Sequence, residues 1–176
     1  RMSRDSWQAV RAVFLAAIMI ISVFAAGIAF SGSAAAQEAG DGEVILLDEN
    51  GNQIDTFSGN TAPQDAIDAA NPGYTVEIGS GTYDGGVTIS KSLTVSGAGM
   101  DTTIIDASQG GQHPINVTSD NVTIRNLQVT NGNSGIYVER TVDANNLRVV
   151  DVKSVESTYG MYLKEHSRYF PTSVIS

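Results

Sequence analysis

Two stretches of the chain match each other at a constant offset of 25 residues: NVTIRNLQVTNGNSGIYV at positions 121–138 and NLRVVDVKSVESTYGMYL at positions 146–163. Eight aligned pairs are identical or chemically similar: Asn121/Asn146, Val122/Leu147, Ile124/Val149, Leu127/Val152, Gly135/Gly160, Ile136/Met161, Tyr137/Tyr162 and Val138/Leu163. A period of roughly 20–30 residues with three short strands per unit is typical of a solenoid, because each strand buries its apolar side only when equivalent strands stack on it.

Short apolar pairs like those of the repeat recur upstream, separated by Gly, Asn and Asp. One series is Val76/Ile78, Leu93/Val95, Val122/Ile124 and Leu147/Val149; a second is Val87/Ile89, Ile115/Val117, Ile136/Val138 and Met161/Leu163; a third is Ile104/Ile105, Leu127/Val129 and Val152/Val155. The leucine spacing and helical leg of leucine-rich repeats are missing, and a β-sandwich does not explain a fixed offset. The sequence therefore predicts an all-β fold, a right-handed parallel β-helix.

Two further elements are expected before the coils. Alternating residues on both sides of Asn50-Gly51 predict a β-hairpin over 43–57. Thr61-Ala62-Pro63-Gln64 has the spacing of a capping box and predicts a short helix over 65–70, which Asn71-Pro72-Gly73 ends. We expect this helix to cap the first coil by closing its open sheet edge.

The first 36 residues have the order of a secretory signal: basic residues, a mostly apolar stretch over 13–30, then small residues. The Ala34-x-Ala36 pair predicts cleavage after Ala36. The alternative is an uncleaved membrane helix, for which about 20 apolar residues are needed. The expected organisation is a signal peptide over 1–36, a hairpin segment over 37–60, β-helix coils over 61–163, and an irregular or truncated segment over 164–176.

Composition excludes several classes of function. The chain has 19 acidic and 10 basic residues and a net charge of −9, which disfavours binding to nucleic acid or to an anionic membrane surface. It contains no cysteine, so disulfides, thiolate catalysis and Cys-ligated metals are excluded. The two histidines, His113 and His166, lie far apart in unrelated contexts, and we expect neither a metal site nor a cofactor.

Two parts of the chain resemble known families. The leader, at 11–17, 21–25 and 29–36, resembles the leaders of haloarchaeal cell-surface (S-layer-type) glycoproteins, which implies export from a salt-loving archaeon. The body, at 66–73, 76–83 and 89–99, resembles the first coils of pectin-lyase-like β-helix proteins. That second family includes lyases, hydrolases, accessory proteins of copper enzymes and inert surface proteins, so the resemblance implies a fold rather than an activity.

Two residue pairs are expected to align across coils. Asn121 and Asn146 would lie one above the other at a turn, where their amides could form a hydrogen-bonded ladder. Tyr137 and Tyr162 would stack about 4.8 Å apart, the spacing of neighbouring strands. The tyrosines form either a packing column or a platform for sugar binding.

The sequence does not assemble a catalytic site. Asp106, Asn126 and Asp151 could face one groove, but one of the three is an amide, and glycoside hydrolysis needs paired carboxylates. Arg125 and Arg148 nearly align, at an offset of 23, without the acidic cluster that binds calcium in lyases. We therefore assign no catalytic residue.

Two sequons fit the pattern Asn-x-Ser/Thr: Asn116-Val117-Thr118 and Asn121-Val122-Thr123. In an exported chain both are candidate N-glycosylation sites, and we expect them to flank a turn between coils. A role in an amide ladder would make Asn121 a poor acceptor, which favours Asn116.

These observations predict a non-catalytic, extracellular domain of a cell-surface glycoprotein with a structural, adhesive or envelope role. Its expected partners are cell-envelope glycans or neighbouring surface proteins, and membrane attachment would come only through the signal segment or an anchor outside this chain. The alternative is the N-terminal part of a carbohydrate-active β-helix enzyme, a polysaccharide lyase or glycoside hydrolase. An accessory protein for copper insertion is a weaker third hypothesis.

Overall fold

The computed structural model describes residues 40, 42–139 and 145–164. The chain divides into two units, residues 1–34 and 35–176, and every described residue belongs to the second. The predicted signal peptide, its cleavage after Ala36 and the segment 165–176 lie outside the described residues. Within the described part of the chain, no helix has the length and apolar character needed to cross a membrane.

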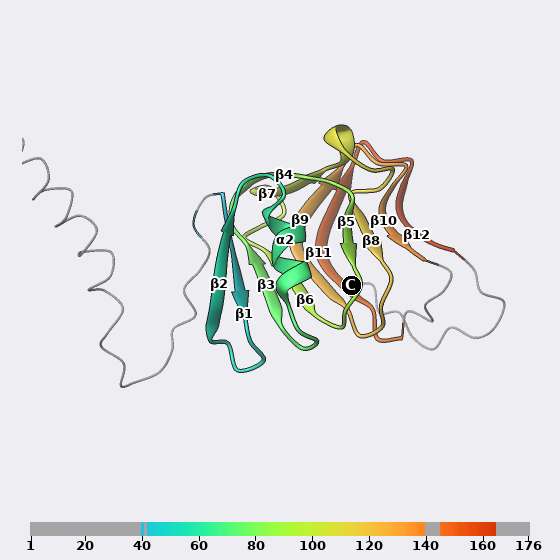
Figure 1. Cartoon of the computed structure of the whole chain (residues 1–176). Coiled ribbons are helices and arrows are strands. Elements are labelled where there is room, and N and C mark those ends of the chain that lie inside the picture. The colour runs from blue at the N-terminus through green and yellow to red at the C-terminus, as the bar shows by residue number, and fades with distance from the viewer. Residues whose placement is uncertain (1–39, 41, 140–144, 165–176) are drawn as a thin grey trace, which may run out of the picture. The chain divides into compact units, whose positions relative to one another are not determined.

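The described residues form twelve strands and one α-helix, with one short 3-10 helix at Ala107–Gln109 (Figure 1). The strands are β1 (Glu43–Leu47), β2 (Gln53–Ser58), β3 (Thr75–Ile78), β4 (Gly81–Asp84), β5 (Val87–Ile89), β6 (Thr94–Gly97), β7 (Thr103–Asp106), β8 (Ile115–Val117), β9 (Thr123–Thr130), β10 (Ser134–Val138), β11 (Arg148–Val155) and β12 (Tyr159–Leu163); the helix is α2 (Ala62–Ala69).

Parallel pairing of equivalent strands builds three walls. Wall 1 contains β3, β6 and the first halves of β9 and β11. Wall 2 contains β4, β7 and the second halves of β9 and β11. Wall 3 is the four-stranded sheet β5-β8-β10-β12. The predicted all-β parallel β-helix, with its preceding hairpin and short capping helix, is confirmed.

The predicted apolar series become columns that fill the interior. Val76 pairs with Val95, Val95 with Ile124, and Ile124 with Val149 in wall 1. Ile115 likewise lies between Val87 and Ile136 in wall 3. Most of these side chains are fully buried, so stacking of equivalent strands removes from water the one apolar side that each strand possesses.

At the corners between strands, residues in the left-handed backbone conformation recur in a regular pattern. Six non-glycine residues have positive φ: Asn121, Asn126, Asn131, Asn146, Asp151 and Glu156. They recur every five residues within a coil and every 25 between coils. Five of the six are Asn or Asp, the side chains that tolerate this conformation best after glycine. Asn126 and Asp151 bend β9 and β11, which is how one strand contributes to two walls.

Asparagine and acidic side chains connect the corners of successive coils. The Asn146 side-chain amide donates to Oδ1 of Asn121 at 2.8 Å, in the geometry that an amide ladder requires. Asn131 donates to Oδ1 of Asp106, also at 2.8 Å. Desolvation opposes ionisation of Asp106, but the hydrogen bonds from Asn131 and from the N–H of Ser108 outweigh it and lower the pKa of this carboxyl.

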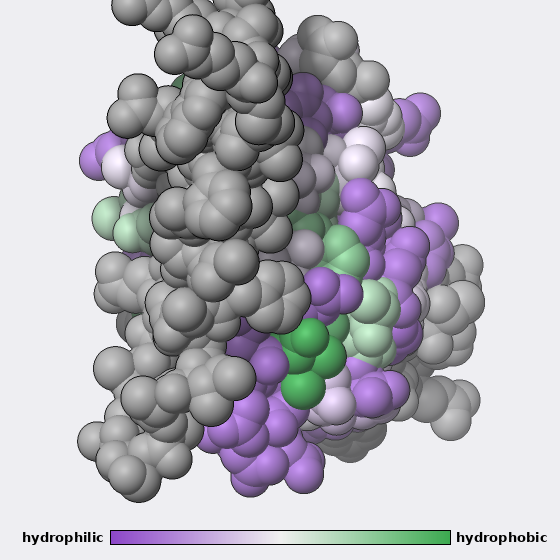
Figure 2. All heavy atoms as spheres, turned by 60° about the vertical axis from the view of Figure 1, so that its left-hand side comes forward, coloured by the Kyte–Doolittle hydropathy of each residue, from purple (hydrophilic) through white to green (hydrophobic). Residues whose placement is uncertain are grey.

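The hairpin extends wall 1 at the N-terminal end. Strand β1 pairs antiparallel with both β2 and β3. Oδ1 of Asp48 accepts from the N–H groups of Asn50 and Asn52, and Oδ2 accepts from the Asn52 side chain. The bonds from Asn52 are the main reason that the pKa of Asp48 is lowered. Asp48 thus holds the loop between β1 and β2 as a hydrogen-bonded turn. Where Figure 2 shows described residues on this side of the molecule, their surface is largely hydrophilic, with a small apolar patch.

Helix α2 covers the edge of wall 3, but the predicted capping box is wrong. The helix begins at Ala62, and Thr61 has helical angles and makes no side-chain cap. Its hydroxyl donates to Asp65 at 3.0 Å instead. The side chain of Gln64 reaches across to the edge strand β5, where its carbonyl accepts from the N–H of Thr88 at 2.7 Å. The side chain of Gln64 therefore forms a hydrogen bond to strand β5 instead of the expected one within the first turn of the helix.

Lys91 closes the other end of α2. Its ammonium donates to the carbonyl oxygens of Ile67, Asp68 and Ala70 at 3.1, 2.8 and 2.8 Å. Carbonyls in the last turn of a helix have no partner within the helix, and a lysine at this end also opposes the negative pole of the helix dipole. Lys91 thereby ties the capping helix to the first coils.

Replacing Lys91 by Met should destabilise the protein by about 1.5–3 kcal/mol, because hydrogen bonds to a charged group are lost while the apolar stem is kept. Urea denaturation of the full chain would measure this change. The matched control is Lys153→Met, whose ammonium pairs with Asp101 at 2.8 Å on the surface, with both side chains substantially exposed. That pair should contribute less than about 1 kcal/mol. Equal losses in the two variants would contradict a capping role for Lys91.

Candidate functional site

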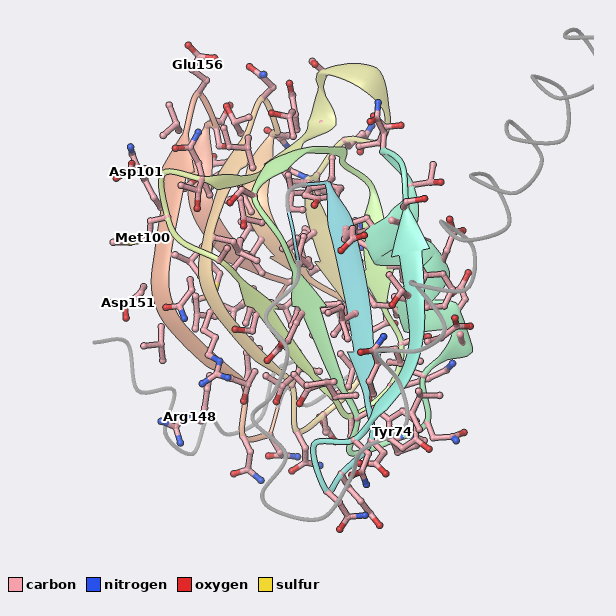
Figure 3. All side chains as sticks on the ribbon, turned by 90° about the vertical axis from the view of Figure 1, so that its left-hand side faces the viewer. Tyr74, Met100, Asp101, Arg148, Asp151 and Glu156 are labelled. Carbon is pink, nitrogen blue, oxygen red and sulfur yellow. The ribbon has the colours of Figure 1, made fainter. Side chains whose placement is uncertain are left out.

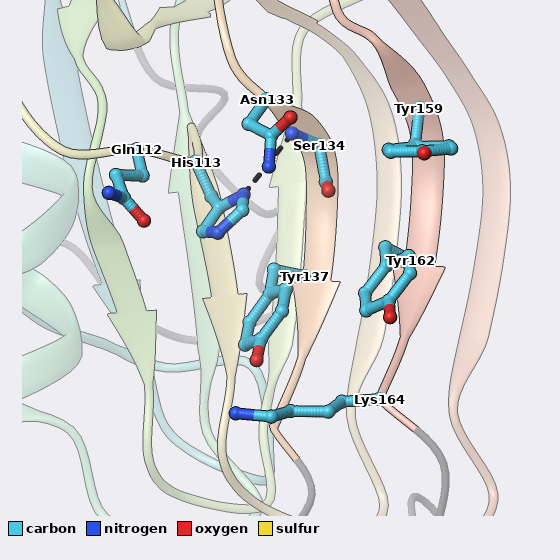
Figure 4. A pocket seen from close by; sticks show the side chains of 8 residues that line it. All are labelled: Gln112, His113, Asn133, Ser134, Tyr137, Tyr159, Tyr162 and Lys164. Carbon is cyan, nitrogen blue, oxygen red and sulfur yellow. Dashed lines mark hydrogen bonds between the residues drawn. The ribbon is translucent and has the colours of Figure 1, made fainter.

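A groove on wall 3 is the candidate site (Figure 4). It has a volume of about 370 Å³ and is formed by β8, β10, β12 and the residues next to them. The lining side chains are aromatic or polar: Gln112, His113, Asn133, Ser134, Tyr137, Tyr159, Tyr162 and Lys164. This volume lies within the range of pockets that hold small molecules, and three phenol hydroxyls and a hydroxymethyl group provide hydrogen-bonding atoms.

An aromatic stack runs across the groove from coil to coil. The rings of His113 and Tyr137 lie 4.4 Å apart at an angle of 13°. The rings of Tyr137 and Tyr162 lie 5.9 Å apart at an angle of 8°. Tyr159 adds a tilted ring 5.6 Å from Tyr162. The last two tyrosines are 52% and 42% exposed, so they offer aromatic surface to a ligand. Tyr137 is half-buried between its neighbours.

Polar contacts hold the groove in shape. Nδ1 of His113 accepts a 3.2 Å hydrogen bond from the N–H of Ser134, which leaves Nε2 as the nitrogen that faces other partners (Figure 4). The ammonium of Lys164 lies 5.8 Å from the Tyr137 ring and 3.5 Å from a carboxylate oxygen of Glu139. The Tyr137 hydroxyl and then the charge of Glu139 raise the pKa of Lys164, so this amine is a cation at neutral pH.

Asn116 lies beside this groove, within a strand. Its side chain points outward from β8, between the buried Ile115 and Val117. In the sheet register Asn116 is opposite Tyr137 on one side and Thr88 on the other. The two sequons flank the connection between β8 and β9, and Asn116 itself lies within the strand on the N-terminal side of that connection. Strand β8 ends at Val117, so Thr118, the last residue of the sequon, directly follows the strand that holds Asn116.

Asn121 has a different environment. It adopts the left-handed conformation with φ 56°. Its side-chain oxygen accepts from Asn146, and its N–H donates to the carbonyl of Asn145 at 2.8 Å. A glycan would attach to Nδ2 of Asn121, whereas the ladder bond uses Oδ1 and fixes the orientation of the amide group. Because the ladder pair holds this amide in one orientation, it disfavours modification at this sequon.

The residues considered for catalysis do not come together. Asp106 pairs with Thr130, at the corner after the one that holds Asn126, so it does not face a groove with Asn126 and Asp151. In the register of β9 and β11, Arg125 is opposite Val150 and Arg148 is opposite Thr123. The two arginines therefore lie at different positions along the strands of wall 1. Arg125 donates to Ser96 at 3.1 Å.

The charged residues along this part of the chain are also spread out. Arg148 and Asp151 in β11, and Glu156 directly after it, lie at successive positions along the chain and point outward (Figure 3). Within residues 40, 42–139 and 145–164, no group of three or more His, Asp or Glu side chains could hold a metal ion.

Most residues of the groove could not be predicted from the sequence. The offset of 25 residues aligns Tyr137 with Tyr162, but His113 and Lys164 have no equivalent residue at that offset. His113 lies three residues before Asn116 and reaches along the strand to stack on Tyr137. The only available signal was the aromatic content of the 159–162 segment, which adds Tyr159 to Tyr162 in one coil.

The fold defines the chain as a β-solenoid whose wall 3 carries a groove lined by aromatic and polar side chains. No protein-family model matches the chain, and no solved structure matches it. The sequence is similar to a protein of Haloarcula japonica named "Cell surface glycoprotein", with 29% identity over 163 aligned residues. The match covers 84% of this chain and 19% of that protein, so this chain spans about a fifth of the relative's length.

Proposed function

We propose that this chain is an exported, non-catalytic part of a cell surface glycoprotein, with a structural role in the cell envelope. The similarity to the Haloarcula japonica protein carries the proposal, because the match extends over most of this chain. The acidic composition and the signal-like leader support it. The stacked coils share one continuous buried apolar interior, which suits a structural component of a surface layer.

Asn116 is the proposed site of N-glycosylation. It is half-buried on an outward-facing position of wall 3. Among the residues that the structure describes, no other side chain makes a hydrogen bond to its amide. Thr118 completes the sequon; its N–H and hydroxyl both donate to the carbonyl of Ile89, at 2.9 and 3.3 Å. Asn121 is left unmodified because its amide belongs to the corner pair with Asn146.

Expression of the full chain in a haloarchaeal host that N-glycosylates exported proteins tests this proposal. Asp120 lies between the two sequons, so digestion on the N-terminal side of aspartate separates Asn116 from Asn121 for mass spectrometry. We expect a glycan on the Asn116 peptide alone, and digestion of the chain by protease added to intact cells. Thr118→Ala should abolish the modification and Thr118→Ser should keep it. An unmodified chain that stays protected inside the cell would contradict the proposal.

A further inference from the structure

The groove on wall 3 and the sequon of Asn116 are neighbours, and we propose that they form one unit: the glycan on Asn116 folds back along the wall and lies in the groove, against the exposed rings of Tyr159 and Tyr162. This inference rests on the proposed glycosylation at Asn116. Beyond that site, the inference says that the ligand of the groove is the chain's own glycan, and that the glycan extends from Asn116 toward β10 and β12.

The sheet register places the glycan attachment point in line with the aromatic stack. Thr88, Asn116, Tyr137 and Tyr162 form one outward-facing row across β5, β8, β10 and β12. Neighbouring strands are about 4.8 Å apart, so Tyr162 lies roughly 10 Å from Asn116 along the row. The first two sugars of a glycan are long enough to cover that distance.

The two sides of Asn116 offer a glycan very different surfaces. Toward the N-terminal end, the row holds the short side chain of Thr88, and its strand is already bonded to Gln64 of helix α2. Toward the C-terminal end lie the groove and two tyrosines with about half of their surface exposed. Contact on the second side removes more apolar surface from water, which directs the glycan there.

The groove also has the chemistry that a sugar requires. Tyrosines combine an apolar ring with a polar hydroxyl, and therefore match sugars, which carry both C–H and hydroxyl groups. Ser134, which is almost fully buried at the floor, and the amides of Gln112 and Asn133 supply further polar atoms. Lys164, whose ammonium lies 3.5 Å from a carboxylate oxygen of Glu139, adds hydrogen-bond donors at the edge of the groove.

Chemical labelling of tyrosines tests the inference on the full chain purified from the glycosylating host. Nitration by tetranitromethane is followed at each tyrosine by mass spectrometry, in the glycosylated protein and in N116Q, which keeps an outward amide but cannot carry the glycan. We expect Tyr159 and Tyr162 to react several-fold more slowly in the glycosylated protein. Tyr74, which lies near the start of β3 and away from the groove, should react at the same rate in both (Figure 3).

Three outcomes are distinguishable. If Asn116 carries a glycan and Tyr159 and Tyr162 react at the same rate with and without it, the docking is overturned while the proposed glycosylation stands. If Asn116 is unmodified, the glycosylation and the docking both fail. If the released glycan protects the tyrosines of N116Q but the linked glycan does not protect them, the groove belongs to an external saccharide. Thr118→Ser is the positive control, since it should keep both modification and protection.

Discussion

Leu127→Ala should lower the free energy of unfolding by about 2–5 kcal/mol, the usual range for a fully buried leucine truncated in a core that cannot collapse. Leu127 is 0% exposed and directly follows Asn126, the corner at which β9 passes from wall 1 to wall 2. Its partner in the next coil is Val152. Since rigid backbone walls surround the site, the cavity left by the missing atoms would persist.

Urea denaturation of the full chain, followed by far-ultraviolet circular dichroism, measures this loss. The matched control is the next residue, Gln128→Ala, whose side chain is half-buried on the outer side of the same strand. Most surface substitutions change stability by less than about 0.5 kcal/mol, and we expect this one to do the same. Similar unfolding midpoints for the two variants would mean that the buried side chains of β9, Leu127 among them, do not form a packed core.

The parallel coils were predictable because stacking imposes a period on the sequence. Val122/Ile124 and Ile136/Val138 repeat 25 residues later, and their apolar pairs recur upstream wherever a strand needs one buried side. The hairpin was predictable from Asn50-Gly51 for a local reason: positive φ at a tight turn favours these residues. Both signals are short-range or periodic, so one sequence is enough to detect them.

Other features depend on contacts that have no period. Tyr83 belongs to the wall 2 column through its register with Ile105, but the sequence series begins one strand later, because an aromatic residue with a hydroxyl does not look like a core position. That hydroxyl donates to the carbonyl of Gly79 at 3.1 Å. Gln64 looked like a local cap and instead bonds to β5. Long-range partners of this kind replace local rules wherever the two compete.

The candidate site was the hardest part to predict. The offset identified Tyr137 and Tyr162 as stacked, without deciding between packing and sugar binding. His113 and Lys164 enter the groove from positions next to the strands, where side-chain direction is set by the path of the chain between coils. The placement of Asn116 within β8, opposite Tyr137, likewise follows from strand boundaries that the sequence gives only to within a few residues.

At Gly97 the backbones of two successive coils approach each other closely. Gly97 ends β6, and its φ is not positive, so glycine is not required there for conformational freedom. A Cβ atom at this position would overlap the carbonyl oxygen of Asn126, and it would lie 2.8 Å from Cβ of Leu127 and 2.9 Å from Cβ of Thr103. The corner of the following coil therefore occupies the space of the missing side chain.

Gly97→Ala should destabilise the protein by about 3 kcal/mol, at the upper end of the usual cost of overpacking, because the nearest obstacle is backbone and cannot rotate away. Relief requires β6 and the Asn126 corner to separate, which weakens the hydrogen bonds between two coils. Gly110→Ala is the matched control: Gly110 has φ −177°, and its Cβ would meet only the Gly85 oxygen at 3.6 Å. Urea denaturation should show a lower midpoint for Gly97→Ala and an almost unchanged one for Gly110→Ala. Equal midpoints would mean that the coils are not packed as tightly at this corner as the contacts of Gly97 require.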